Sequence, residues 1–521
     1  MKLLTNHKIY LLLFLGFPAI FLLVLLFWES ALPYVGYNAW NFNTYALIAH
    51  NYNSLGFFET HFVPIISVAK TLPGQPEYYL NHPPLLSVLI GLVFRVFGES
   101  FFTGRLVNIV ASFFSTLILF GIARQIRGKT YATIVLFVSS LLPATSIFGR
   151  MIGQESLLLL FALLSFYSVL LFEKSRDIKW VWLAAVSLIL GALTDWASVY
   201  FSFALAYYLI QWREKRFALL FISVSIFASL AYILFIQFIT QDISFLFAGF
   251  LNRSAGAVTQ SSNWVLTWAL AILTRFFLYF NPIFLILSVY FLLNRKRFAS
   301  RDVVTIALCF LFFGLAHIIL YTEGSFGHPY WTYYLLPFVV FASSAVIKRL
   351  LPKHKTIIAL GLVFSLCYAV GLVYWKTKEV EGNVFRYELA SVASSYFSAY
   401  QTIGVNRNGV IDPDIFQYSF HLPTQILEVN QDVFQIKDTA GFVFSCFSPC
   451  NDDDSQIKHL REQYGGLKLV GGGVEMWIFK ENADGRLTGL KEIPVSLPKE
   501  SNSLFAKAYR VLMTYVKVPQ L

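Results

Sequence analysis

The chain has 521 residues, of which 57% are hydrophobic and only 13% are charged, and its mean hydropathy is +0.62. This composition excludes an ordinary soluble globular protein, because one soluble core could not bury so much apolar surface. The net charge of +11 would favour nucleic acid as the partner of a soluble protein. Here the Lys and Arg residues border apolar runs, as they do in the cytoplasmic loops of membrane proteins. We therefore predict a multi-pass membrane protein that contacts the lipid bilayer and binds no nucleic acid.

The apolar runs define the predicted fold. Runs long enough to cross about 30 Å of hydrocarbon are expected at residues 9–27, 103–123, 131–149, 154–172, 180–194, 196–211, 217–239, 276–294, 303–321, 331–347 and 356–375. A short stretch at 84–97 is expected to be interfacial or re-entrant, and another at 264–273 could add an excursion into the membrane. The predicted fold class is a polytopic all-α membrane domain with about 11–13 spans over residues 1–375, followed by a small extracytoplasmic α/β domain over residues 376–521.

The basic residues orient this domain. They form six clusters beside the apolar runs, at residues 2–8, 124–129, 174–179, 213–216, 295–301 and 348–355. By the positive-inside rule all six are cytoplasmic, which places the N-terminus inside. An odd number of spans then places the C-terminal domain on the extracytoplasmic side, together with a polar, aromatic outer loop at residues 28–83. Because structureless loops of that length are uncommon in compact folds, this loop is more typical of a site than of a linker. A short interfacial helix is expected near Trp40–Ala49.

Polar residues that interrupt the apolar pattern all emerge on the same outer face. They lie in five separated segments: the loop up to His82, Arg150–Glu155, Thr194–Trp196, Asn252–Arg253 and His328–Trp331. Ionisable residues at membrane depth are candidates for a functional site. Each also has an ordinary structural explanation, since Glu155 and Asp195 could be helix caps and His82 could simply end the loop before two prolines. His328 and its aromatic neighbours could form an interfacial belt.

Several motifs resemble a known family. They are WNFNTYALIAHN, YYLNHPPLLSVLIGLVFRVFGESFFTGRLVNI, GRMIGQESLLLLF, LTDWASVYF and HPYWTYYLLPF. In this order and spacing they resemble the dolichyl-phosphate-mannose-protein mannosyltransferase-like (PMT-like) branch of the GT-C membrane glycosyltransferases, to which the lipid A aminoarabinose transferases are related. The resemblance covers residues from about 34 to 340. It implies transfer of a sugar from a polyprenyl-phosphate donor to an acceptor hydroxyl of a glycan, lipid or protein, on the extracytoplasmic face of the cell membrane.

The resemblance also implies roles for particular residues. His82 matches the position at which the family places a basic residue toward the lipid phosphate. Topology alone adds Arg150 and Arg253 as candidate phosphate partners. Glu155 and Asp195 match acidic positions of the branch and are the candidate catalytic carboxylates, because an acceptor hydroxyl needs a base.

The first outer loop departs from the family pattern. Members usually carry an Asp early in this loop, whereas no carboxylate lies here between Glu29 and Glu59. Either Glu155 or Asp195 takes the role of that acid, or Glu59 reaches in, or the chain is a non-catalytic relative. The remaining candidate substrate-binding residues, apart from Glu59, are Trp40, Asn41, Asn43, His328 and Tyr330. A divalent metal ion is compatible with two carboxylates and a phosphate, but no spacing in the sequence demands one.

Two other functions stay open. In a lipid or sugar transporter the same ionisable residues would line a path, although they cluster on one side and no inverted repeat is apparent. A pseudoenzyme that binds a lipid-linked sugar is favoured by the missing loop carboxylate.

The C-terminal part mixes helical and strand patterns. Helices are expected near 387–400 and 456–464, strands at QTIGV, QILEV, GFVFSCF and GVEMWIF, and an amphipathic helix at 502–517. Cys446 and Cys450 are expected to form a disulfide, because no His or third Cys accompanies them as in a metal site.

Overall fold

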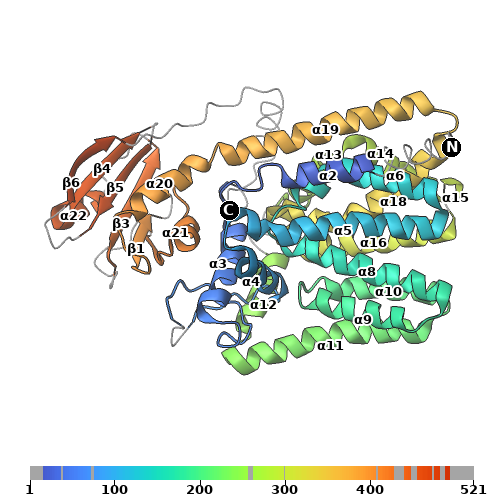
Figure 1. The fold of residues 1–521 in the computed structure, drawn as a ribbon, viewed down its shortest axis with the longest axis horizontal. Helices are drawn as coiled ribbons and strands as arrows, with labels where there is room; N and C mark the ends of the chain where they lie inside the picture. Colours follow the sequence, from blue (N-terminus) through green and yellow to red (C-terminus); the bar gives the residue numbers. More distant parts are fainter. Residues whose placement is uncertain are drawn as a thin grey trace.

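The computed structural model describes residues 16–36, 39–71, 76–255, 262–298, 300–406, 409–427, 439–447, 455–471, 474–480 and 487–492. It shows a bundle of roughly parallel helices with a small α/β domain at one end (Figure 1). The helices before that domain are α2 (Phe17–Phe27), α3 (Ala39–Leu55), α4 (Leu85–Phe97), α5 (Phe101–Arg127), α6 (Lys129–Leu141), α7 (Pro143–Ile147), α8 (Gln154–Ser175), α9 (Lys179–Ala192), α10 (Ser198–Gln211), α11 (Lys215–Thr240), α12 (Ser244–Ser254), α13 (Trp264–Tyr279), α14 (Pro282–Leu293), α15 (Arg295–Phe298), α16 (Arg301–Leu320), α17 (Thr322–Gly327), η3 (Pro329–Leu335), α18 (Leu336–Leu350) and α19 (Lys355–Glu381).

Within the described residues, six helical segments are long and apolar enough to cross a membrane by length and composition. They are 101–127, 154–175, 215–240, 301–320, 329–350 and 355–394. The bent pair α13 and α14 makes a possible seventh span, and α2, α4, α6 and α9 are shorter apolar helices. A polytopic helical membrane domain is therefore confirmed. By this criterion the described residues hold six spans, or seven with the bent pair, which is fewer than the about 11–13 expected.

The segment expected as one span at 276–294 is divided, so that prediction is wrong. Helices α13 and α14 meet at 113°. The cause is local, because Asn281 has a positive φ of 61° and its side chain accepts a hydrogen bond from the Ile283 N–H at 3.0 Å. Pro282 then begins the new helix at a position where its missing N–H costs nothing. The stretch 264–273, expected to be a separate excursion, is the first part of α13.

The predicted span 131–149 is also interrupted. Helix α6 ends at Leu141, and Pro143 begins the short helix α7. The residue before a proline is driven to an extended conformation, and Leu142 has φ −77° and ψ 120°. The chain then turns at residues 148–153, so that α8 begins one residue before Glu155.

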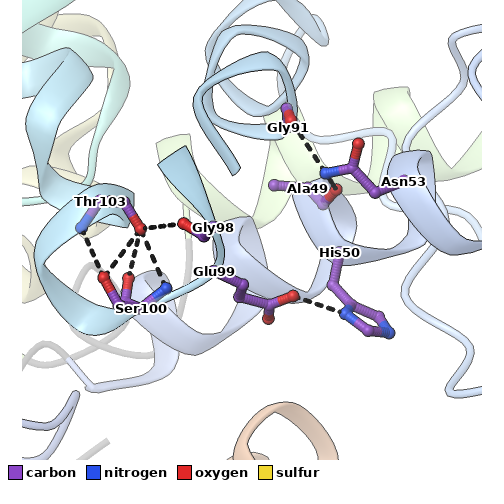
Figure 2. Close-up of polar contacts among 8 residues, drawn as sticks. All are labelled: Ala49, His50, Asn53, Gly91, Gly98, Glu99, Ser100 and Thr103. Carbon is purple, nitrogen blue, oxygen red and sulfur yellow. Dashed lines mark hydrogen bonds and ion pairs between the residues drawn. The ribbon is translucent and has the colours of Figure 1, made fainter. Parts of the chain in front are cut away.

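Helix α3, which the outer loop was expected to contain, is fixed to its neighbours at the end of the bundle. The Asn53 side chain donates to the Gly91 carbonyl of α4 at 2.8 Å, and His50 Nδ1 lies 2.8 Å from Glu99 Oε2 (Figure 2). Ser100 and Thr103 form the capping box that begins α5. These contacts hold α3 against the turn between α4 and α5.

The C-terminal domain is built on a six-stranded sheet in the order β2-β1-β3-β5-β4-β6. Strand β1 pairs in parallel with β2 and β3, β5 pairs antiparallel with β3 and β4, and β4 pairs in parallel with β6. The elements are α20 (Val384–Ser394), β1 (Ile403–Asn406), α21 (Pro413–Phe420), β2 (Thr424–Leu427), β3 (Gly441–Phe447), α22 (Ser455–Tyr464), β4 (Gly465–Gly471), β5 (Val474–Phe479) and β6 (Leu487–Glu492).

The predicted α/β domain is thus confirmed, whereas α21, β4 and β6 were not predicted. Helix α19 continues to Glu381, so the predicted boundary after residue 375 falls inside a helix. Cys446 is disulfide-bonded. Its expected partner Cys450 and the predicted helix at 502–517 lie outside the described residues.

We expect the stability of this domain to depend on pH through one carboxyl group, that of Asp414. Burial, together with the charge of Asp412, raises the pKa of Asp414 from 3.8 to about 6. Folding therefore binds a proton between these values, and the stability that Asp414 contributes is lost as the pH rises through them. We expect the melting temperature of Asp414→Asn, relative to that of the wild type, to increase from pH 4 to pH 6, since asparagine does not titrate. Scanning fluorimetry of both proteins across this pH range measures the difference. A difference in melting temperature that stays constant with pH would contradict a raised pKa of Asp414.

Candidate functional site

Asp195 is the centre of the candidate site. It lies in the turn between α9 and α10 and is 3% exposed. Its Oδ1 accepts a hydrogen bond from the Ala197 N–H at 3.1 Å, and its Oδ2 accepts one from the Tyr334 hydroxyl at 3.0 Å. The first bond is the local contact expected of a capping carboxylate. The second comes from a distant segment, so Asp195 does more than cap a helix.

Two hydrogen bonds bring the end of the outer loop to this turn. The Leu85 N–H donates to the Leu193 carbonyl at 3.0 Å, and the Trp196 indole donates to the Asn81 carbonyl at 2.9 Å. They place His82 Nδ1 at 3.9 Å from Asp195 Oδ1, with His82 itself 8% exposed. This distance is too long for a direct hydrogen bond, so His82 Nδ1 is a buried nitrogen without a hydrogen-bond partner among the described residues.

Arg253 supplies positive charge to the same place. It lies on α12, which packs against α17 at the end of the bundle (Figure 1). Its charge acts on Tyr79, His82 and Asp195. Three residues predicted from three separate segments thus come together.

Glu155 completes this group from the first turn of α8. It is 2% exposed and lies within electrostatic range of both Asp195 and Arg253. Among the described residues no group hydrogen-bonds its Oε2 atom. A buried polar atom without a partner is costly, so this oxygen is available to a water molecule or a ligand. We call Glu155, Asp195, His82, Arg253 and Tyr334 the Asp195 cluster.

A second polar chain borders the cluster. The Asn41 amide donates to the Tyr330 hydroxyl at 2.6 Å, and that hydroxyl lies 2.9 Å from His328 Nδ1. The charge of Glu155 acts on Tyr330, so the chain lies beside the acidic residues. Asn41, Tyr330 and His328, all predicted to bind substrate, are therefore placed together.

The electrostatics keep the histidines neutral. Burial lowers the pKa of His82 well below its usual range, and the charge of Arg253 lowers it further. Burial and the charges of Arg253 and Arg275 lower the pKa of His328 to about 4. Burial raises the pKa of Asp195, although its hydrogen bonds from Ala197 and Tyr334 oppose the rise. Arg253 is thus the positive charge that could meet an anionic ligand at neutral pH.

The other predicted residues are placed differently. Asn43 donates to Asp414 Oδ2 at 2.7 Å and so faces the C-terminal domain. Arg150 donates to the Trp28 carbonyl and to Thr377 Oγ1, the latter at 3.0 Å. Glu59 is exposed on the turn after α3. Trp40 is 52% exposed, with its ring 6.0 Å from that of Tyr79 at the rim of the group.

Several residues of the site were not predicted. Tyr334 holds Asp195, and the Tyr79 hydroxyl lies 3.1 Å from that of Tyr45. His317 is 3% exposed and its Nδ1 lies 2.5 Å from the Tyr200 hydroxyl. Tyr79 and Tyr334 lie within motifs that carry the family resemblance, which was the available signal, whereas His317 lies inside an apolar helix with no such signal.

An apolar groove of about 560 Å³ begins next to the cluster. Pro84 and Leu85 line its start, directly after His82 and Pro83, and Leu193 lines it two residues before Asp195. The rest of the wall comes from Phe62, α4, α9 and α11, including Val224, Phe227 and Phe235. A long apolar chain in this groove would carry its head group at His82.

A substitution at Gly153 tests whether the position of Glu155 matters, without removing the Glu155 carboxylate. A Cβ atom at Gly153 would lie 2.5 Å from Glu155 Oε2, while the backbone there, with φ −170° and ψ 157°, accepts alanine. We expect Gly153→Ala to displace the carboxylate and lower kcat by about 10-fold to 100-fold, with unfolding free energy changed by less than about 1 kcal/mol. Gly371→Ala, which meets no atom within 4 Å, is the matched control. Equal activity of the two variants would contradict a catalytic position for Glu155.

Comparisons with known proteins concern the family and the fold. Residues 81–241 match the family model described as dolichyl-phosphate-mannose-protein mannosyltransferase, a segment that contains His82, Glu155 and Asp195. The fold is similar to that of ArnT from Cupriavidus metallidurans in the apo state, with a TM-score of 0.59 and 12% identity over 91% of this chain and 98% of ArnT. For ArnT bound to undecaprenyl phosphate the TM-score is 0.62, with 11% identity over 90% and 98% of the two chains. No curated protein sequence matches the chain. The matched segment and the shared fold confirm the resemblance of this multi-pass membrane protein to the PMT-like branch of the GT-C glycosyltransferases.

Proposed function

We propose that this protein transfers a sugar from a polyprenyl-phosphate donor to an acceptor hydroxyl on the extracytoplasmic face of the membrane. The observation that carries the proposal is the apolar groove that begins at Pro84, close to the buried His82 and the half-buried Arg253. This arrangement combines an apolar surface for a prenyl chain with a cationic position for its phosphate. The ArnT structure with undecaprenyl phosphate, which shares the fold, supports a ligand of this class.

The donor phosphate would bind between Arg253 and His82. Arg253 supplies the charge, and charge-assisted hydrogen bonds to phosphate are about twice as strong as neutral ones. The donor phosphate is a diester with one negative charge, and this charge near His82 would raise the pKa of the imidazole, so that His82 becomes a cation held between Asp195 and the phosphate. Both residues would then stabilise the phosphate as it becomes the leaving group.

The transfer itself needs one base. The acceptor oxygen attacks the anomeric carbon of the sugar, its bond to that carbon forms, and the bond from the anomeric carbon to the phosphate oxygen breaks. The hydroxyl proton passes to Glu155, whose Oε2 has no hydrogen-bond partner among the described residues. Asp195, whose two oxygens accept hydrogen bonds from Ala197 and Tyr334, orients His82 instead. Asn41 and Tyr330 bind sugar hydroxyls, and Trp40 lies at the rim of the site.

A divalent metal ion remains a proposal. Among the described residues no group of three His, Cys, Asp or Glu side chains is placed to hold one. Glu155 and Asp195 together offer two carboxylates, so phosphate oxygens and water would have to complete the usual set of oxygen ligands.

We also propose a topology. The N-terminus is cytoplasmic and the C-terminal domain extracytoplasmic, because the basic clusters favour the cytoplasm. The acceptor is a glycan, a lipid or a protein with a free hydroxyl on the outer face.

The test is transfer of radiolabelled sugar by the purified protein in lipid bilayers, with a panel of polyprenyl-phosphate sugars and acceptors. Product that depends on both donor and acceptor supports the glycosyltransferase. Donor binding without product across the panel would contradict it and favour a sugar-binding pseudoenzyme. Movement of labelled donor between leaflets, without product, would favour a transporter.

A further inference from the structure

Helix α3 presents two faces with different partners. Asn41 and Tyr45 lie one turn apart, so they share a face, and both meet the candidate site through Tyr330 and Tyr79. Asn43 and His50 are seven residues apart and share another face. Asn43 donates to Asp414 at 2.7 Å, and the His50 ring stacks on His421 with 4.3 Å between centroids.

The C-terminal domain meets this second face through a single short element. Asp414 lies in the first turn of α21, Tyr418 lies one turn later, and His421 directly follows the helix. Tyr418 stacks on Tyr34 at 5.5 Å between centroids, so these three side chains all contact α3 or the segment that leads into it. In Figure 1, α21 is the part of the domain next to α3.

The apolar cores of the two parts interlock at the same place. Val35, from the outer loop, is 2% exposed within the core of the C-terminal domain, beside Phe385 and Leu389. Conversely, Tyr418 is buried in the cluster formed by α3 and α4, which includes Tyr34. Each part therefore buries a side chain of the other, and the domain is not merely tethered by α19.

The polar contact between the two parts makes the orientation specific. The Asn43 amide donates both to Asp414 and to the Tyr34 carbonyl, at 2.7 and 3.0 Å. A buried donor left without its acceptor is costly, so this contact favours one orientation of α3. Rotating α3 about its axis would break this contact and move Asn41 away from Tyr330, because the two asparagines lie on one rigid helix.

We propose that the C-terminal domain positions α3, with Asn43 and Asp414 as positioning residues, and thereby holds Asn41 against Tyr330 in the candidate site. This role explains why Asn43 faces away from the site although it lies only two residues from Asn41. It makes the extracytoplasmic domain part of the structure that organises the site. The consequence for catalysis rests on the proposed function, whereas the restraint on α3 does not.

The test compares Asp414→Leu, which removes the acceptor, with Asp414→Asn, whose amide oxygen can still accept from Asn43. Both are made in the full chain in lipid nanodiscs. Lys468→Met is the matched control, since it breaks the 2.9 Å ion pair with Glu475 inside the sheet of the same domain. Hydrogen exchange of residues 39–55 is measured for each variant, together with kcat and KM for transfer. Asn43→Ala removes the donor of the same hydrogen bond, and it replaces Asp414→Leu in the test if that variant does not fold.

We expect Asp414→Leu to speed exchange in α3 by about 10-fold and to lower kcat by about 10-fold, with KM within about 2-fold. Asp414→Asn and Lys468→Met should resemble the wild type in both readouts. Unchanged hydrogen exchange of α3 in Asp414→Leu would overturn the proposal. An equal loss of activity in Asp414→Leu and Asp414→Asn would overturn it as well. If Asn43→Ala instead raises KM and leaves kcat and exchange unchanged, Asn43 binds substrate and the positioning role is wrong. If the wild type transfers no sugar, the proposed function fails, and the exchange measurement still decides whether the domain restrains α3.

Discussion

Replacement of Glu155 by glutamine is expected to lower kcat by about 100-fold to 10,000-fold, the usual contribution of a general base. Glutamine keeps the size of the side chain and loses only the ability to accept a proton. Glu155 is the carboxylate of the Asp195 cluster with a buried oxygen that has no hydrogen-bond partner in the described part of the chain. Donor affinity should stay close to that of the wild type, because the phosphate contacts belong to Arg253 and His82. The measurement is kcat for sugar transfer beside donor binding in the same bilayers.

Glu173→Gln provides the matched control within the same helix. Glu173 lies near the other end of α8, where it accepts a hydrogen bond from the Tyr208 hydroxyl at 3.0 Å. The same chemical change there should leave kcat unchanged. Full activity of Glu155→Gln would exclude it as the base. A loss in Asp195→Asn alone, with donor binding retained, would then identify Asp195 as the base.

Replacement of Arg253 by alanine is expected to weaken donor binding by about 10-fold to 100-fold, the loss of one charge-assisted hydrogen bond at about 1.5–3 kcal/mol. Arg253 is the residue whose positive charge acts on His82, Asp195 and Glu155 together. Donor dissociation constants, measured at low and high salt, test this prediction. The wild type should lose affinity with salt more steeply than the variant, because a screened charge contributes less.

Arg150→Ala is the informative comparison for this variant. Arg150 was predicted as a phosphate partner from topology alone, but it donates to the Trp28 carbonyl and to Thr377. Its loss should lower thermal stability without a change in the donor dissociation constant. The opposite result, weaker donor binding in Arg150→Ala and normal donor binding in Arg253→Ala, would show that the phosphate binds at Arg150 instead.

The sequence was sufficient to predict which segments meet. His82, Asp195 and Arg253 come from three separated segments, and the positions of the basic clusters already placed all three on one face. Which side chains within a segment enter the site depends on helix rotation, which only packing decides. Asn41 and Asn43 illustrate this, because both were predicted to bind substrate and they point to different partners.

The aromatic run from Pro329 to Leu335 illustrates a second limit. It folds as a 3₁₀ helix, with three residues per turn instead of 3.6. An α-helical interpretation therefore could not show that Tyr334 would reach Asp195 while Tyr330 reaches Asn41.

The division of the span at 276–294 was open to prediction. Asn281 and Pro282 form an Asn-Pro pair, which favours a turn, and the apolar residues on both sides outweighed this signal in the hydropathy pattern.

The position of a bound polyprenyl phosphate tests the central claim most directly. The measurement is an electron cryomicroscopy structure of the protein in nanodiscs with polyprenyl phosphate. The account predicts the phosphate between Arg253 and His82, with the chain running from Pro84 along the groove between α4, α9 and α11. A phosphate bound at Arg150, or a prenyl chain outside this groove, would contradict it.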